Sequence, residues 1–187
     1  MDEWSQKRDT MQHYNVVAKS YDELYANEQK AKIETALKKV GVSNNSLILD
    51  SGCGTGLLFE YVADKAKIVM GLDISRELLK EAKKRAKSFG NVHLILADAD
   101  YTPFKDGVFS HVFAVTLLQN MPNPEKTLAE LTRVAGKNAF LIVTGLKKRF
   151  SLIFLENLLR KLKLKVIEIV DGNQLLKCYV AVCVKVS

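Results

Sequence analysis

The segment around residue 50 constrains the fold more than any other part of the chain. Apolar residues over Leu47–Asp50 predict a strand, and a helix is expected from about Gly56 to Lys65. Between them, glycines stand at alternate positions: Gly52, Gly54 and Gly56. Glycine allows sharp turns and a close approach of the backbone to a ligand, and the amides that open a helix receive polar ligand groups. The segment therefore predicts a strand–loop–helix unit with a ligand beyond the strand's carboxyl end, as in open α/β sheets.

The remaining chain alternates strand-like and helix-like stretches, which predicts an α/β fold with a mainly parallel sheet. The 187 residues suit one domain, 1–187, in which 1–41 is helical and Gly41 is a plausible stop. Further strands are expected over Ile68–Asp73, Val92–Leu96, Phe109–Val115, Ala139–Thr144, Lys165–Val170 and Cys178–Val186. Helices are expected from near Ser75, from Asn123-Pro124 to about Ala135 with Gly136 as the stop, and over Ser151–Leu162. The turn Asp171-Gly172-Asn173 indicates that the last two strands are antiparallel.

The spacing of the glycine loop narrows the kind of ligand. The dinucleotide pattern G-x-G-x-x-G places its third glycine one position later, where this chain has Leu57. No lysine followed by serine or threonine closes the loop, so it is not a phosphate-binding P-loop. The acid directly before the loop, Asp50, would repel a pyrophosphate but suits the cationic ammonium and sulfonium of S-adenosylmethionine. The loop therefore favours that cofactor over a dinucleotide.

Two further acids end the next two strands. Asp73 lies 17 residues after Gly56 and is placed to accept hydrogen bonds from both hydroxyls of a ribose, unless it only opens the helix at Ser75. Asp98 follows the third strand, where it is placed to accept from the amino group of an adenine, and the amide of Ala99 could reach a ring nitrogen. Three acids that close three successive strands indicate an adenosine site.

On these motifs the chain resembles the class I (Rossmann-like) S-adenosylmethionine-dependent methyltransferases, from about Tyr14 to its end. The resemblance rests on residues 47–56, 71–75, 97–99 and 109–124. It implies a three-layer Rossmann-like methyltransferase fold with a seven-stranded, mostly parallel sheet and an antiparallel last strand. It also implies an enzyme that transfers a methyl group from S-adenosylmethionine to an acceptor.

The resemblance implies a role for each residue of the cofactor site. The methionine part would be surrounded by Asp50, Gly52, Cys53 and Gly54, and Val115 would pass close to its carboxyl or amino group. Asp73 and Ile74 would hold the ribose and flank the adenine, whose edge would meet Asp98 and Ala99. The N-terminal helical region 1–41 would act as a lid, for which the candidates are Tyr14 and Tyr21, although both could equally serve helix packing.

The chain departs from the family after the fourth strand. Residues 117–122 carry neither the histidine pair of many small-molecule members nor the Asn-Pro-Pro-Tyr signature of enzymes that methylate amide or exocyclic amino nitrogens. The acceptor, an RNA base or a small molecule, therefore stays open. No catalytic residue is assigned, because a general base is needed only if the acceptor holds its proton. Candidates for a role at the acceptor are His13, Gln119 and Asn120, whereas His93 and His111 are expected to be structural strand residues.

Charge indicates possible partners. The net charge is +7, and residues 147–165 hold seven cations and one acid, which suits RNA or a solvated helix face. A small activator protein, as some RNA-modifying relatives use, could cover Val92, Leu94 and Leu96 on an edge strand, unless these residues belong to the core.

Other classes are less favoured. Cys178 and Cys183 are expected to be buried apolar residues, and no metal site is expected. No apolar run reaches the roughly 20 residues of a membrane span, and the charged N-terminus lacks a signal core, so we expect a cytoplasmic protein without a membrane partner. The alternative to an enzyme is a non-catalytic S-adenosylmethionine-binding or scaffold protein that works with a partner. A dehydrogenase is disfavoured by the loop spacing.

Overall fold

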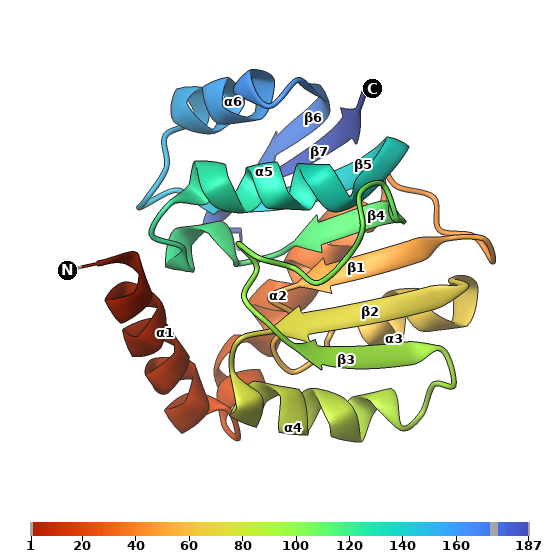
Figure 1. Cartoon of the computed structure of the whole chain (residues 1–187), viewed down its shortest axis with the longest axis vertical. Helices are drawn as coiled ribbons and strands as arrows, with labels where there is room; N and C mark the ends of the chain where they lie inside the picture. Colours follow the sequence, from red (N-terminus) through yellow and green to blue (C-terminus); the bar gives the residue numbers. More distant parts are fainter. Residues whose placement is uncertain (1, 173–175, 187) are drawn as a thin grey trace.

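A computed structural model of the chain describes residues 2–172 and 176–186. Its centre is a seven-stranded sheet with the strand order β3-β2-β1-β4-β5-β7-β6 (Figure 1). The strands are β1 (Leu47–Ser51), β2 (Ile68–Asp73), β3 (Val92–Leu96), β4 (Phe109–Ala114), β5 (Ala135–Leu146), β6 (Leu164–Asp171) and β7 (Cys178–Lys185).

The first five strands run parallel, and the last strand runs against its neighbours. β1 pairs with β2 and β4, β2 with β3, and β4 with β5, all in parallel. β7 lies between β5 and β6 and is antiparallel to both. This confirms the predicted sheet, and Cys178 and Cys183 of β7 are buried as predicted. Of the expected turn, Asp171 ends β6 and Gly172 follows it, whereas Asn173 lies outside the described residues.

Helices cover both faces of the sheet, so the fold has three layers. Leucines of α5 and α6 pack into one apolar core, and residues of α2, α3 and α4 pack into another on the opposite face. Figure 1 shows α5 in front of the sheet and α2 and α3 behind it. The helices are α1 (Glu3–Val17), α2 (Tyr21–Leu37), α3 (Phe59–Val62), α4 (Arg76–Ala86), α5 (Pro124–Val134) and α6 (Leu152–Lys161), with 3₁₀ turns η1 (Ala63–Lys65) and η2 (Leu118–Asn120). In the part of the chain that the structure describes, no helix is long and apolar enough to cross a bilayer.

Local capping chemistry sets the helix starts that the sequence predicted. The hydroxyl of Ser75 accepts from the amide of Leu78 at 3.1 Å at the start of α4. The side chain of Asn123 accepts from the amide of Lys126 at 3.2 Å, with Pro124 at the first helical position of α5. These caps satisfy amides that have no partner within the helix.

Several predicted boundaries were wrong. The helix after the glycine loop begins at Phe59 rather than Gly56, and α2 ends at Leu37, before Gly41. β4 ends at Ala114, so Val115 directly follows the strand. Gly136 was predicted to end α5, but it lies in β5. A Cβ atom at this position would stand 3.1 Å from the carbonyl oxygen of Gly107. The glycine therefore serves close backbone contact between segments, which its sequence position does not reveal.

Candidate functional site

Two adjoining cavities lie at the carboxyl ends of the parallel strands. The larger, about 650 Å³ including space open to solvent, is lined by strand-end residues and by α1 and the start of α2. The smaller, about 370 Å³ on the same measure, shares Tyr21, Gly52, Gly54 and Val115 with it. Among the residues predicted for the site, Asp50 and Cys53 line the smaller cavity alone, and the larger one is lined by Tyr21, Gly52, Gly54, Asp73, Ile74, Asp98, Ala99 and Val115. The chain thus brings all ten residues predicted to bind the cofactor to these two cavities.

The glycine loop turns through left-handed backbone conformations. Gly52, Gly54 and Gly56 have φ values of 73°, 56° and 79°, a region in which other residues are strained. The amides of Gly52 and Cys53 donate to the carbonyl of Leu72 at 2.8 and 2.9 Å, which holds the loop against β2. A Cβ atom on Gly56 would collide with the ring of Phe59, whereas one on Gly54 would meet nothing within 4 Å. Gly54 therefore faces open space at the site.

Asp73 receives two backbone amides. One carboxylate oxygen accepts from Gly54 and the other from Ser75, both at 2.8 Å. Burial raises the pKa of Asp73, and the amide hydrogen bonds offset part of that rise. Each carboxylate oxygen has two lone pairs, so both retain capacity for a ligand hydroxyl.

Asp50 is buried and faces the smaller cavity without a hydrogen-bonding partner among residues 2–172 and 176–186. Burial and the nearby charge of Asp73 raise the pKa of Asp50 to about 8. A buried carboxylate without a partner is costly, and a cationic ligand group would relieve that cost. The chemistry of this site therefore fits the ammonium and sulfonium of S-adenosylmethionine.

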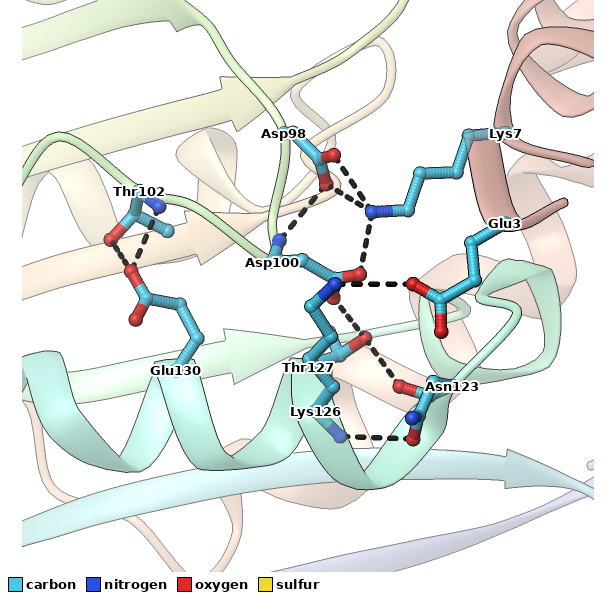
Figure 2. A network of polar contacts seen from close by, with 9 residues as sticks. All are labelled: Glu3, Lys7, Asp98, Asp100, Thr102, Asn123, Lys126, Thr127 and Glu130. Carbon is cyan, nitrogen blue, oxygen red and sulfur yellow. Dashed lines mark hydrogen bonds and ion pairs between the residues drawn. The ribbon is translucent and has the colours of Figure 1, made fainter. Parts of the chain in front are cut away.

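Asp98 is held by a lysine that the sequence did not point to. Lys7 of α1 is buried, and its ammonium donates to both oxygens of Asp98 at 2.9 and 2.7 Å and to Asp100 at 2.5 Å (Figure 2). Burial lowers the pKa of Lys7, but the hydrogen bonds to Asp100 and Asp98 raise it by more. The sequence hints at this role of Lys7 only through helical spacing. Positions 7, 10 and 14 share one face of a helix, and Lys7, Thr10 and Tyr14 all line the larger cavity.

A strained residue follows β4. Thr116 has a φ of 63°, which is unusual for a β-branched residue and marks sites where the surroundings impose the conformation. Its amide donates to the hydroxyl of Thr144 at 2.7 Å. Its own hydroxyl donates to Gln29 at 2.8 Å and accepts from the ammonium of Lys32 at 2.9 Å. The sequence analysis missed Thr116, Gln29 and Lys32, because their contacts join segments more than 80 residues apart.

Tyr14 and Asn120 join this cluster to α1. The amide nitrogen of Asn120 donates to the hydroxyl of Tyr14 at 3.0 Å and to the carbonyl of Thr116 at 2.8 Å. Tyr14 also meets the ring of Tyr21, with ring centroids 6.0 Å apart. Both tyrosines line the larger cavity and belong to a small apolar cluster. Each tyrosine therefore lines the cavity and also takes part in helix packing.

Of the remaining polar candidates, only Asn120 lines one of the two cavities. His111 is a strand residue as expected: its ring hydrogen-bonds Ser110 at 2.8 Å and the carbonyl of Gly41 at 3.0 Å, and burial lowers its pKa. His93 likewise lies in β3. His13 is exposed on α1, and neither His13 nor Gln119 lines either of these two cavities, whereas Asn120 lines the larger one.

The parallel sheet, the glycine loop and the carboxylates at its edge define an α/β protein of the nucleotide-cofactor-binding class. A family model described as the methyltransferase domain matches residues 49–143. The chain therefore belongs to the S-adenosylmethionine-dependent methyltransferase family, and S-adenosylmethionine is its cofactor.

Curated relatives include an uncharacterized protein and a named methyltransferase. An uncharacterized protein of Methanocaldococcus jannaschii is 28% identical over 183 residues, which cover 91% of this chain and 69% of that protein. A demethylmenaquinone methyltransferase of Tropheryma whipplei is 33% identical over 134 residues, which cover 70% of this chain and 56% of that protein. Relatives such as the second are thus matched over little more than half of their length.

Solved structures share the fold. A magnesium protoporphyrin IX methyltransferase of Synechocystis with bound S-adenosylmethionine superposes with a TM-score of 0.81 at 16% identity, over 99% of this chain and 98% of that one. A methyltransferase in complex with the Trm112 methyltransferase activator of Haloferax volcanii gives a TM-score of 0.79 at 16% identity, over 93% of this chain and 98% of that one. At these identities the likeness shows the fold alone.

Proposed function

We propose that this chain transfers the methyl group of S-adenosylmethionine to an acceptor that enters beside Thr116 and Asn120. The observation that carries the proposal is the distribution of carboxylates over the two adjoining cavities. Asp50 lines the smaller one without a partner in the part of the chain that the structure describes, and Asp73 and Asp98 line the larger one. This separation suits a ligand with a cationic end and a neutral nucleoside end.

The assignment of residues follows from the donor and acceptor groups present. Asp50, with Gly52, Cys53 and Gly54, would hold the methionine part, and Val115 would lie beside it. Asp73 would accept from the ribose hydroxyls and Ile74 would pack on the adenine. Asp98 and the amide of Ala99 would meet the edge of the adenine. In this proposal, residues 1–41 form a lid on the single domain 1–187, through Tyr14 and Tyr21.

Two phenol groups, those of Tyr14 and Tyr21, line the larger cavity beside Thr116 and Asn120. Burial raises the pKa of Tyr14 and of Tyr21 above the ordinary range. S-adenosylmethionine supplies an already activated methyl group when bound. The chain's contribution is therefore alignment and exclusion of water, with Asn120 and Thr116 as the polar groups that orient an acceptor carrying its own reactive lone pair.

Two acceptor classes are each favoured by a specific observation. The exposed loop after β5 carries Lys148 and Arg149, and the guanidinium of Arg149 contacts the carbonyl of Gln119 at 3.4 Å, next to Asn120 of the cavity wall. Cations at this rim favour a phosphate-bearing acceptor such as RNA. The name of the Tropheryma whipplei relative favours a small molecule instead.

A small activator protein is the partner that we propose. β3 is an edge strand of the sheet, and exposed edges are ready to pair with another chain. On this strand Leu96 is half exposed, whereas Val92 and Leu94 are partly buried against the core. The predicted apolar edge is thus reduced to Leu96, and backbone pairing would supply most of the contact. The Haloferax volcanii complex supports a partner of this kind, and a cytoplasmic location belongs to the same proposal.

Calorimetry with S-adenosylmethionine, S-adenosylhomocysteine and NAD tests the cofactor assignment on the wild type and Asp73→Ala. We expect binding of both sulfur ligands, no binding of NAD, and a loss of affinity of roughly 100-fold in Asp73→Ala, because two ribose hydrogen bonds to a charged group disappear. An exposed acid, Asp64, provides the matched control Asp64→Ala, which should bind like the wild type. Full affinity in Asp73→Ala would refute the ribose assignment.

A salt series of tRNA and rRNA binding separates the acceptor classes. An RNA acceptor predicts affinity that falls steeply with salt and weakens further in Lys148→Ala/Arg149→Ala. A flat or absent response favours a small molecule. Tight cofactor binding without methyl transfer to any acceptor, with or without an activator, would favour the non-catalytic scaffold.

A further inference from the structure

Helix α1 covers the larger cavity but is attached by few apolar contacts. Lys7 is its one buried residue, and Thr10 and Tyr14 face the cavity beside it. Burying an ammonium is unfavourable unless it is paired and fully hydrogen-bonded. The docking of this half of α1 therefore depends on the partners of Lys7.

Those partners are two carboxylates from the loop after β3. The ammonium of Lys7 donates to Asp98 and Asp100, and the second oxygen of Asp100 accepts from the hydroxyl of Thr127 at 2.5 Å. The amide of Asp100 in turn donates to Asp98 at 2.9 Å. Figure 2 shows both carboxylates converging on the one ammonium. One cation thus neutralises one of two negative charges that lie close together.

The ammonium of Lys7 fixes how Asp98 is presented to the cavity. A carboxylate paired with an ammonium has oxygens that accept hydrogen bonds and no proton to donate. Lys7 and the amide of Asp100 both donate to Asp98, which holds its carboxylate in one orientation at the wall of the larger cavity. Without Lys7, the like charges of Asp98 and Asp100 would repel each other, and the carboxylate of Asp98 would lose this orientation.

We propose that Lys7 is a positioning residue that sets the purine specificity of the cofactor site, because it keeps Asp98 an obligate acceptor that faces the purine. This inference rests on the proposed function, in which Asp98 meets the adenine edge. An acceptor there favours the 6-amino group of adenine and opposes the 6-oxo group of a deaminated purine. Because Lys7 belongs to α1, the docking of this helix over the larger cavity also orients Asp98 toward the purine.

A second contact of the same helix provides a matched control. Glu3 of α1 accepts from the ammonium of Lys126 at 3.1 Å, and both side chains are substantially exposed. Glu3→Gln removes an ion pair one helical turn from Lys7 without touching Asp98. A general loss of α1 attachment would affect Glu3→Gln and the Lys7 variants alike, whereas a change in purine preference should appear only when Lys7 is replaced.

The experiment compares the dissociation constants of S-adenosylhomocysteine and S-inosylhomocysteine, in which a 6-oxo group replaces the 6-amino group. We expect the wild type and Glu3→Gln to prefer the adenine ligand by about 10- to 100-fold, the effect of one mispaired buried polar group. In Lys7→Met this ratio should fall by roughly tenfold, and Lys7→Arg should restore most of it because the charge is kept. Asp98→Asn, whose amide can donate, should also lose the preference.

Three results would contradict the proposal or its basis. A ratio in Lys7→Met equal to that of the wild type, with both ligands weakened alike, would reduce Lys7 to a structural role and overturn the inference. An unchanged ratio in Asp98→Asn would overturn it without requiring Lys7→Met to fold. If the wild type bound neither ligand, the proposed cofactor site itself would be refuted, which is distinct from a failure of purine selection.

Discussion

Asp50 lies one residue before the end of β1, Asp73 ends the adjacent parallel strand β2, and the charge of Asp73 adds to burial in raising the pKa of Asp50 to about 8. The carboxyl group that faces the smaller cavity is therefore largely neutral at neutral pH in the ligand-free protein. A cationic ligand favours the ionised form, so ligand binding and proton release from Asp50 are linked.

The affinity for S-adenosylmethionine should rise with pH up to about 8 and level off above it, because the cation binds the ionised carboxylate. Asp50→Asn should bind at least about tenfold more weakly at pH 8.5, since a charged hydrogen bond is lost, and should show a smaller pH dependence than the wild type. Calorimetry between pH 6 and 9 measures both curves. Parallel curves for the two proteins would contradict the assignment of Asp50.

The stability of the ligand-free protein should respond to pH in the opposite direction. A carboxyl group whose pKa is higher in the folded than in the unfolded state binds more protons when folded, so stability falls as pH rises from about 4, its unfolded value, toward about 8. Asp50→Asn removes this contribution and should gain stability relative to the wild type as pH rises through this range. Urea unfolding at pH 5 and pH 8.5 tests this. A difference between variant and wild type that is the same at both pH values would count against it.

Two glycines of the same loop should separate stability from binding. Gly56→Ala combines left-handed strain with a collision against Phe59 and should cost roughly 3 kcal/mol of unfolding free energy. Gly54→Ala carries the strain alone, about 1–2 kcal/mol, but its methyl group points into open space at both cavities. Thermal unfolding and S-adenosylhomocysteine binding are measured for both variants. Relative to the stability that it loses, Gly54→Ala should lose more affinity than Gly56→Ala. The reverse order would place the ligand away from Gly54.

The hydroxyl of Thr144 supports the strained backbone of Thr116. Thr144 is 1% exposed, and Thr144→Val leaves the amide of Thr116 without its acceptor, at a cost of about 1–3 kcal/mol. Thr132→Val is the control, because among the described residues the hydroxyl of Thr132 bonds only the carbonyl of Leu128 in its own helix, and we expect a change within about 0.5 kcal/mol. Denaturant unfolding compares the two. Equal losses would show that Thr116 does not depend on this hydrogen bond.

Local patterns predicted the sheet and the strand-end acids well. Asp50, Asp73 and Asp98 each lie at or just past the end of an apolar strand, and parallel topology brings such ends to one edge. Start signals such as Ser75 and Asn123-Pro124 were equally local and correct. Local patterns give wrong predictions where one residue type serves two roles. Gly136 was predicted to end a helix, but it allows close backbone contact with Gly107.

The rest of the site depends on contacts between distant segments. Lys7 meets Asp98 across 91 residues and Lys32 meets Thr116 across 84, and no spacing rule connects them. A lysine on a polar helix predicts a solvated side chain, so its burial follows only from how α1 is placed over the sheet. The residues that line the cavity from α1 and α2 were thus beyond reach except for the tyrosines.

The position of β7 bears on how the polypeptide is made. β7 is the last strand in sequence, yet it lies between β5 and β6 and supplies hydrogen bonds to both. During synthesis β6 therefore emerges from the ribosome with no neighbour to pair with, because its connection to the sheet arrives only with residues 178–185. Until then β6 has no strand to pair with, so its backbone edge stays open to pairing with other chains while synthesis continues.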